Sequence, residues 1–156
     1  MKKKISNKIL EYQEKIKRYC SIQERCQQDV EKKLNNWGVC KNDVEDLVAE
    51  LIDNDFLNEQ RYCNAYALGK FKFNKWGKIK INYHLKLKRV SNTCIKKSLS
   101  LLHNDDYLKT INELINQKYV SIKDENIYIK NAKSAKYLIG KGFESELVWQ
   151  QIKKIN

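Results

Sequence analysis

Apolar residues recur at helical spacing along the chain, and one apolar pattern occurs three times. Each copy has a leucine, a glycine or arginine four residues later, an apolar residue directly after that, and then an amphipathic stretch. The copies are Leu34, Gly38, Val39, Val44, Val48 and Leu51; Leu85, Arg89, Val90, Ile95, Leu99 and Leu102; and Leu138, Gly142, Phe143, Val148, Ile152 and Ile155. They are offset by 51 and then by 53 residues, which predicts a helical repeat rather than a globule with a central pocket.

The periodicity predicts three helices in each repeat. They cover about 8–24, 27–36 and 43–53, then 59–73, 78–87 and 92–102, then 105–117, 126–140 and 144–155. Proline is absent and only five glycines occur, so little in the chain interrupts these helices. We therefore predict an all-α fold of three tandem three-helix repeats that form an elongated, curved array. The expected units are 1–57, which includes a basic N-terminal segment, 58–103 and 104–156.

Local signals set the expected helix ends. Gly38 can adopt the left-handed conformation that ends the helix over 27–36, and Arg89 holds the equivalent position, where the backbone often needs a positive φ. A capping-box match from Ser21 to Glu24 gives a less favoured, alternative start for the second helix. The expected N-caps of later helices are Asn42, Asn58, Ser91 or Asn92, and Asn104 or Asp105.

Several classes of protein are disfavoured by composition. No apolar stretch approaches the roughly 18–20 residues that a membrane span requires, and no apolar core follows the basic start, which excludes a secretory signal. The five cysteines are scattered and form no C-x-x-C pair, so a reducing cytoplasm is the expected location. Cys20, Cys63 and Cys94 occupy positions where helix cores take small apolar residues.

No pattern of residues indicates an enzyme. The only histidines are His84 and His103, and the chain has no phosphate-binding glycine loop, no G-x-S-x-G and no H-E-x-x-H. The acidic residues between Glu45 and Asp55 fit a solvated helix face and a turn better than a metal site. We expect no catalytic activity, no cofactor and no metal.

Positive charge is concentrated in one part of the chain. The net charge of +12 divides into +5 over 1–39, −6 over 40–59, +11 over 60–104 and +2 over 105–156. The segment 60–104 contains eleven Lys and Arg residues and no Asp or Glu, which predicts a localised positive surface. Such a surface could hold a phosphate backbone, an acidic protein groove, or a protein already wrapped on DNA. A low-GC genome rich in lysine codons is the alternative explanation of the lysines.

Aromatic residues are interleaved with these cations. Phe71 and Trp76 fall near the turn between the helices over 59–73 and 78–87, where packing is a better explanation than base stacking. Trp76 is expected to position this turn. The candidate partner-binding residues are Arg61, Lys70, Lys72, Lys75, Trp76, Lys78, Lys80, Lys86, Lys88, Arg89, Lys96 and Lys97.

A signature in the second repeat resembles the RecX family of bacterial RecA regulators. The residues that carry it are Asn58, Arg61-Tyr62-Cys63, Tyr66, Lys70, Lys72, Trp76-Gly77, Lys80-Ile81 and the run from Leu85 to Val90, and the likeness extends over about 15–155. The chain departs from the family pattern at four positions, namely Cys26, Cys63, Lys78 and Arg89. None of these departures removes the signature.

The resemblance implies a regulator without catalytic activity in DNA repair and the SOS response, and the polar ends of the predicted array favour a monomer. It implies three modules that lie in the groove of the RecA filament on single-stranded DNA and inhibit ATP hydrolysis, strand exchange and co-protease activity, with direct contact to DNA as a further feature. The alternative is a sequence-tolerant DNA-binding protein that acts independently of RecA. A third hypothesis is a helical scaffold for an unrelated acidic partner.

Overall fold

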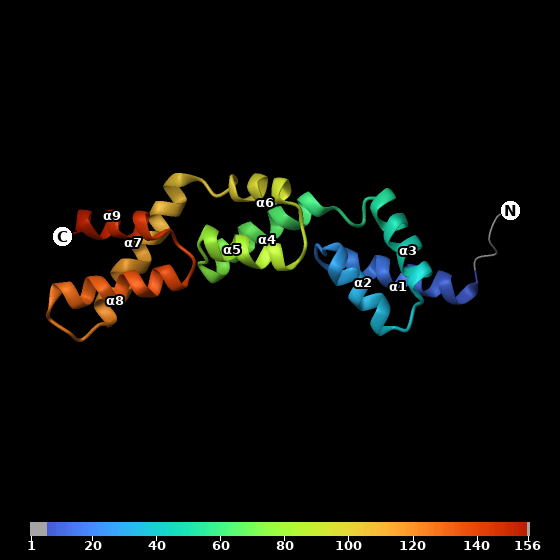
Figure 1. Cartoon of the computed structure of the whole chain (residues 1–156), viewed down its shortest axis with the longest axis horizontal. Coiled ribbons are helices and arrows are strands. Elements are labelled where there is room, and N and C mark those ends of the chain that lie inside the picture. The colour runs from blue at the N-terminus through green and yellow to red at the C-terminus, as the bar shows by residue number, and fades with distance from the viewer. Residues whose placement is uncertain (1–5, 156) are drawn as a thin grey trace.

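The computed structural model describes residues 6–155, and this part of the chain forms helices without any strand. Figure 1 shows them arranged end to end along one long axis. The helices are α1 (Asn7–Ile22), α2 (Gln27–Asn36), α3 (Lys41–Asp53), α4 (Glu59–Asn74), α5 (Lys78–Leu87), α6 (Asn92–Leu99), α7 (Asn104–Ser121), α8 (Ile127–Gly140) and α9 (Ser145–Ile155). None of the helices within 6–155 is long and apolar enough to cross a bilayer. The basic segment expected at the start of the chain lies outside the described residues.

The helices pack in three groups of three. Unit 1 consists of α1–α3, unit 2 of α4–α6 and unit 3 of α7–α9, and every pair of helices in substantial contact belongs to one unit. Figure 1 shows the three units following one another, so the first and last helices lie at opposite ends of the molecule. The predicted all-α fold of three-helix repeats in an elongated array is confirmed.

Each unit has its own hydrophobic core. Unit 1 buries Ile16, Leu34 and Leu51, unit 2 buries Cys63, Ile81 and Leu85, and unit 3 buries Tyr107, Ile111 and Phe143. Full burial of one such aliphatic or aromatic side chain stabilises a fold by roughly 1.5–3 kcal/mol. Because a core built on about fifty residues is small, the contacts between units also matter for stability.

The buried cysteines serve these cores as small apolar residues. Cys20 and Cys63 are buried and Cys94 packs against the core of unit 2, as predicted. Burial raises the pKa of the Cys20 thiol to about 11 and that of Cys63 to about 12. Cys26 belongs to unit 1 by sequence, yet it lies in the core of unit 2 and so links the two units.

The repeat seen in the sequence is also a repeat of backbone geometry. The third helices of the units begin at Lys41, Asn92 and Ser145, which are offset by the same 51 and 53 residues. The turn before each of them contains a residue with a left-handed backbone: φ is 82° at Gly38, 59° at Arg89 and 94° at Gly142. This confirms the predicted positive φ at Arg89.

Some helix ends differ from the sequence-based expectations. Asn58 and Ser91 cap α4 and α6 as predicted, by accepting hydrogen bonds from the backbone N–H groups of Arg61 and Cys94. The caps predicted at Asn42 and at Asn104 or Asp105 are wrong, because Cys40 and His103 occupy the N-cap positions of α3 and α7 with extended backbones. In both cases the N-cap residue directly follows a buried apolar residue, Val39 or Leu102, which fixes where the chain must turn.

Three other boundaries shift. The alternative helix start at Ser21 is wrong, since α1 continues to Ile22 and α2 begins after Cys26. Helix α6 ends at Leu99, three residues early, and α7 continues to Ser121, four residues late. The extension of α7 has a packing reason: Tyr119 lies beyond the predicted end and still packs against the core of unit 3.

The two junctions between units are built differently. Between units 2 and 3, the backbone N–H groups of Gly77 and Ile79 donate to the carbonyl oxygens of Lys141 and Gly142 at 2.8 and 3.0 Å. A Cβ atom on Gly77 would lie 2.3 Å from the carbonyl carbon of Gly142, so the two backbones touch. This junction depends on main-chain contacts that only glycine allows.

Between units 1 and 2, charged side chains pair across the junction. The Arg61 Nε lies 2.6 Å from Glu24 Oε1, and the Lys88 Nζ lies 2.8 Å from Asp29 Oδ1. The side-chain amide of Gln28 also donates to the Leu87 carbonyl oxygen at 3.3 Å. The first junction therefore combines ion pairs with the burial of Cys26, whereas the second contains direct backbone-to-backbone hydrogen bonds.

Candidate functional site

The turn between α4 and α5 collects aromatic and cationic side chains around Trp76. The indole packs against the core of unit 2 and is only half-buried, and its ring centroid lies 4.8 Å from that of His84. The Nζ atoms of Lys70 and Lys80 lie 4.9 and 4.5 Å from the Trp76 ring centroid. Ammonium groups at these distances are attracted by the ring quadrupole. Trp76 thus holds two cations at the protein surface, in addition to its expected packing role.

Local backbone geometry explains why this cluster forms. Lys75 adopts a left-handed conformation, with φ of 56°, and ends α4. The chain then reverses through Trp76 and Gly77 into α5, which brings Lys70 before the turn and Lys80 after it to the same indole. The predicted residues Lys70, Trp76 and Lys80 are therefore brought together by one reversal of the chain.

Two other predicted cations lie near the same turn and have other neighbours. The Lys78 Nζ lies 5.0 Å from the ring centroid of Tyr107, so this side chain faces unit 3. Lys72 is exposed on α4, with its Nζ 5.6 Å from the Phe73 ring centroid. These two side chains border the Trp76 cluster but do not contact its indole.

Arg61 and Lys88 are paired with carboxylates of unit 1. Hydrogen bonding to Glu24 raises the pKa of Arg61, and hydrogen bonding to Asp29 raises the pKa of Lys88. Burial alone would raise the pKa of Asp29, but hydrogen bonds from Lys88 and Cys26 outweigh it and lower that pKa. The sequence segment 60–104 lacks acids, yet the fold supplies acids from unit 1, so these two cations are partly neutralised at the junction.

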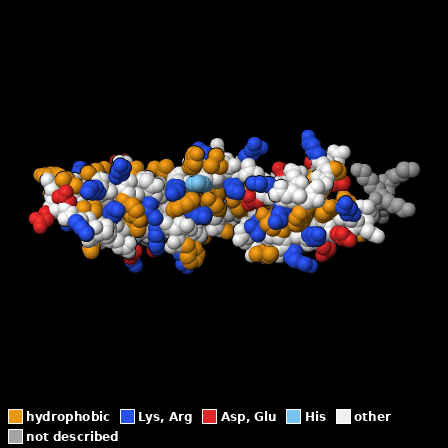
Figure 2. Space-filling view, turned by 90° about the horizontal axis from the view of Figure 1, so that it is seen from below, with side chains coloured by type: hydrophobic (Ala, Val, Ile, Leu, Met, Phe, Trp, Pro, Cys, Tyr) orange, Lys and Arg blue, Asp and Glu red, His pale blue; other side chains and the backbone are white. Residues whose placement is uncertain are grey.

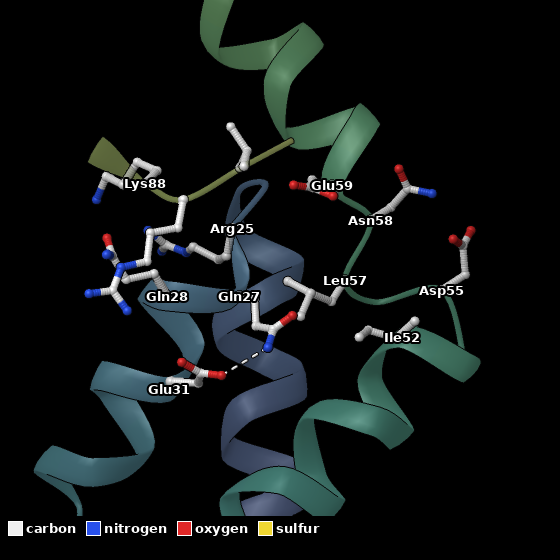
Figure 3. A pocket seen from close by; sticks show the side chains of 12 residues that line it. Arg25, Gln27, Gln28, Glu31, Ile52, Asp55, Leu57, Asn58, Glu59 and Lys88 are labelled. Atoms are coloured by element: carbon white, nitrogen blue, oxygen red, sulfur yellow. Dashed lines mark hydrogen bonds between the residues drawn. The ribbon is translucent and has the colours of Figure 1, made fainter. Parts of the chain in front are cut away.

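A groove of about 560 Å³ lies at this junction (Figure 3). Arg25, Lys88 and Arg89 line it together with Glu31 and Asp55, so its walls carry both signs of charge. Arg89 is exposed, at the end of α5. Of the predicted site residues, Lys70, Trp76 and Lys80 thus form one cluster, whereas Lys88 and Arg89 line this groove of mixed charge.

Three further predicted cations are exposed and, like Lys72 and Arg89, belong to no ion pair in the described part of the chain. Lys86 lies in the last turn of α5, and Lys96 and Lys97 lie in the last turn of α6. None of the ion pairs within residues 6–155 involves them. Cations at the end of a helix stabilise it through the helix dipole, and they are also available to a negative partner.

Sequence reasoning missed an exposed apolar row on α5. Ile79, Tyr83 and Leu87 have exposed fractions of 56%, 60% and 55%, although they were absent from the candidate site. The signal was present, because these residues are spaced by four while the buried Ile81 and Leu85 form a second row spaced by four. When only one apolar face is expected per helix, the row that includes Ile81 and Leu85 accounts for that face. The exposed row is then overlooked.

The described residues form no recognisable metal site. No group of three His, Cys, Asp or Glu side chains that could hold a metal ion occurs within 6–155. His84 packs against Trp76 with the two rings tilted by 31°, and it also makes an edge contact with Tyr83, at 5.4 Å between ring centroids. The chemistry available at this surface is therefore attraction of negative charge and contact with apolar or aromatic groups.

The chain is similar in sequence to RecX proteins. Residues 58–99 match the family model of the second three-helix domain of RecX. The chain is 29% identical over 117 residues to the regulatory protein RecX of Clostridium acetobutylicum, which covers 72% of this chain and 53% of that protein. It is 25% identical over 134 residues to the regulatory protein RecX of Clostridium tetani, which covers 84% of this chain and 59% of that protein.

Solved structures agree with the fold. The crystal structure of RecX from Lactobacillus salivarius superposes with a TM-score of 0.86 at 20% identity, covering 96% of this chain and 97% of that one. A crystal structure of a regulatory protein RecX gives a TM-score of 0.84 at 19% identity, covering 99% of this chain and 82% of that one. The chain spans little more than half the length of the curated relatives named above.

Proposed function

We propose that this chain belongs to the RecX family and is a regulator of RecA, on the strength of its second unit and of the relatives it resembles. The proposed partner is the RecA filament on single-stranded DNA, and the proposed effect is inhibition of ATP hydrolysis, strand exchange and co-protease activity. The setting would be DNA repair and the SOS response in the cytoplasm. The proposed regulator is a monomer and performs no catalysis of its own.

One observation carries the proposal beyond family likeness. Unit 2 presents exposed cations from two helices, Lys86 on α5 and Lys96 and Lys97 on α6, and its own sequence supplies no Asp or Glu over 60–104. A surface of this kind attracts a polyanion or an acidic protein face and accelerates their encounter. A RecA filament offers the phosphate backbone of its bound strand and the protein surface around it.

The elongated shape suits a polymeric partner. Three units in a row offer three separate contact surfaces along one axis (Figure 1). Once one unit is bound, the next unit binds at a high effective concentration, so weak contacts add to a strong attachment. A rod that contacts several protomers in this way would restrain their movement relative to each other, which explains inhibition without catalysis.

The test is RecA ATPase activity on single-stranded DNA with this protein added below the concentration of RecA. We expect slowing of ATP hydrolysis. The double variant Lys96→Glu/Lys97→Glu should weaken this effect about tenfold or more, because two attractive contacts become repulsive. Circular dichroism should show unchanged helicity, since both side chains are exposed.

The matched control is Lys153→Glu/Lys154→Glu. These adjacent lysines occupy the last turn of α9, the corresponding helix of unit 3, so this variant makes the same change in net charge and helix-end environment. It should inhibit RecA almost as well as the unaltered chain. If the unaltered chain does not slow RecA at any ratio, the proposal is wrong. If both double variants lose inhibition equally, unit 2 is not the site of the effect.

The second candidate function is sequence-tolerant binding to DNA without RecA. The Trp76 cluster favours it, because an indole flanked by Lys70 and Lys80 combines an aromatic surface with phosphate-binding cations. A steep fall in single-strand affinity with salt, together with no effect on RecA, would select this function. Affinities for the filament, for bare single strand and for free RecA in one buffer separate the two candidates.

A further inference from the structure

Helix α5 carries an apolar row that faces solvent. Ile79, Tyr83 and Leu87 are each more than half exposed. A spacing of four residues places successive side chains almost above one another on a helix, so the three form a continuous row along α5. In a chain with 32% charged residues, an exposed row of large apolar side chains marks a surface that contacts another molecule.

This row is separate from the core of unit 2. Ile81 and Leu85 have exposed fractions of 0% and fix the buried face of the same helix. With 3.6 residues per turn, the row of Ile79 and Tyr83 points roughly away from that face. The core is therefore complete without the exposed row, and folding of unit 2 does not require it to be apolar.

Units 1 and 3 show that the fold does not require apolar residues at the equivalent positions. In unit 1, the positions 51 residues earlier are polar and lie on α2, a helix of the same length: Gln28, Lys32 and Asn36. In unit 3, the positions 53 residues later on α8 are small or charged: Ala132, Lys136 and Gly140. The apolar row is thus a property of unit 2 alone.

Cations border the row on both sides. Helical geometry puts Lys86 along one edge and Lys80 along the other, next to His84. At the Lys80 edge the row continues into aromatic rings, because Tyr83 contacts His84 and His84 packs against Trp76. Figure 2, seen from the side on which α4 and α5 lie, shows hydrophobic side chains in the middle of the molecule with Lys and Arg side chains around them.

We infer that this row, Ile79, Tyr83 and Leu87, is a protein-docking ridge that inserts into an apolar hollow bordered by Asp and Glu carboxylates. The inference rests on the proposed function, and the occupant is then the protein surface of a RecA protomer in the filament rather than the bound DNA strand. Phosphate and sugar offer no apolar partner for isoleucine and leucine, whereas a protein hollow offers one. Because lysines flank the row, a hollow with carboxylates at its border complements it in charge.

The test is to give α5 the residues that unit 1 has at the same positions, as Ile79→Gln/Tyr83→Lys/Leu87→Asn. This triple variant removes the apolar row and adds one positive charge. Binding to RecA filaments on a labelled single strand should weaken at least tenfold, since large apolar anchors at the centre of an interface dominate its affinity. Binding to the bare single strand should stay constant or rise, because the added lysine favours phosphate.

The matched control makes the same kinds of change on unit 3, at Ile129→Gln/Tyr128→Lys/Ile139→Asn. These three side chains are also exposed, by 39%, 81% and 41%. The control should bind filaments within threefold of the unaltered chain. Two results would overturn the ridge and leave the proposed function intact. One is an equal loss of filament affinity in the control, and the other is no loss of filament affinity in the α5 variant while the unaltered chain binds. Failure of the unaltered chain to bind filaments overturns both.

A second measurement does not depend on the folding of the triple variant. Replacing Tyr83 alone by the photoreactive analogue p-benzoylphenylalanine keeps an aromatic group in the row. Irradiation on filaments should link this position to RecA protein, and links to the DNA strand alone would overturn the ridge. The same analogue at Tyr128 should give little product.

Discussion

At the scale of single residues, one repeat position has a left-handed backbone in all three units but different surroundings in each. Gly38, Arg89 and Gly142 occupy equivalent turns and all have positive φ. A Cβ on Gly38 would meet nothing within 4 Å, whereas a Cβ on Gly142 would lie 2.3 Å from Cβ of Lys80. Arg89 shows that the turn tolerates a side chain, so the glycine at 142 is required by its neighbour in unit 2.

Substituting these two glycines separates backbone strain from steric contact. Gly38→Ala should lower the free energy of unfolding by about 1 kcal/mol, the cost of a left-handed alanine. Gly142→Ala should lower it by about 3 kcal/mol, because overpacking against Lys80 adds to the same strain. Urea unfolding followed by circular dichroism measures both. Equal losses would show that units 2 and 3 separate readily at this contact.

At the scale of elements, the first backbone N–H groups of α5 are hydrogen-bonded by another unit. The first backbone N–H groups of a helix have no partners inside it and need external acceptors. Helices α4 and α6 use the side chains of Asn58 and Ser91 for this purpose. At α5 the acceptors come from unit 3, where the Tyr107 hydroxyl accepts from the Lys78 N–H at 3.0 Å. Unit 3 therefore fixes the start of the helix that carries the proposed ridge.

Tyr107→Phe tests this dependence of α5 on unit 3. The Tyr107 hydroxyl also donates to Glu144 at 2.7 Å, so its loss leaves a donor and an acceptor without partners. We expect the free energy of unfolding to fall by about 1–2 kcal/mol. Tyr128→Phe, at an exposed ring, is the control and should change nothing in the same urea titration. A Tyr107 variant as stable as this control would contradict the role of the hydroxyl.

At the scale of the whole molecule, the three units are joined by one ionic junction and one backbone junction. Asp29 pairs with Lys88 across the first junction, and its pKa is lowered. A carboxyl group with a lowered folded-state pKa contributes stability above its unfolded-state pKa of about 4, and that contribution disappears as pH falls through the folded-state value. The junction between units 1 and 2 should therefore weaken in acid.

Asp29→Asn measures this contribution. At pH 7 the variant should be less stable to urea by about 1 kcal/mol, and the difference from the unaltered chain should shrink as the pH falls below the unfolded-state pKa of about 4 and through the lowered folded-state pKa. Asp46→Asn, at an exposed position on α3, serves as the comparison. A difference that stays constant between pH 7 and pH 3 would mean that the charge of Asp29 contributes nothing at the junction.

The sequence by itself determined the helices, the repeat and the position of the positive unit. Each helix buries one face, and that face is marked by periodic apolar residues such as Leu34, Leu85 and Leu138. The local pattern is therefore sufficient to place the helices and the three cores. The absence of acids over 60–104 is a property of composition and needs no structure. The family signature also lies in contiguous sequence.

Only the tertiary structure decided which cations are free and which apolar residues are exposed. Lys88 meets a carboxylate 59 residues away, and Arg61 meets one 37 residues away in addition to the nearby Asp55. Lys96 and Lys97 meet none within 6–155, and no local pattern predicts the distant pairs. The same holds for the two apolar rows of α5, of which packing buries Ile81 and leaves Tyr83 exposed. The physical reason is that pairing and burial depend on neighbours brought together by the fold, whereas helix formation depends on residues three and four apart.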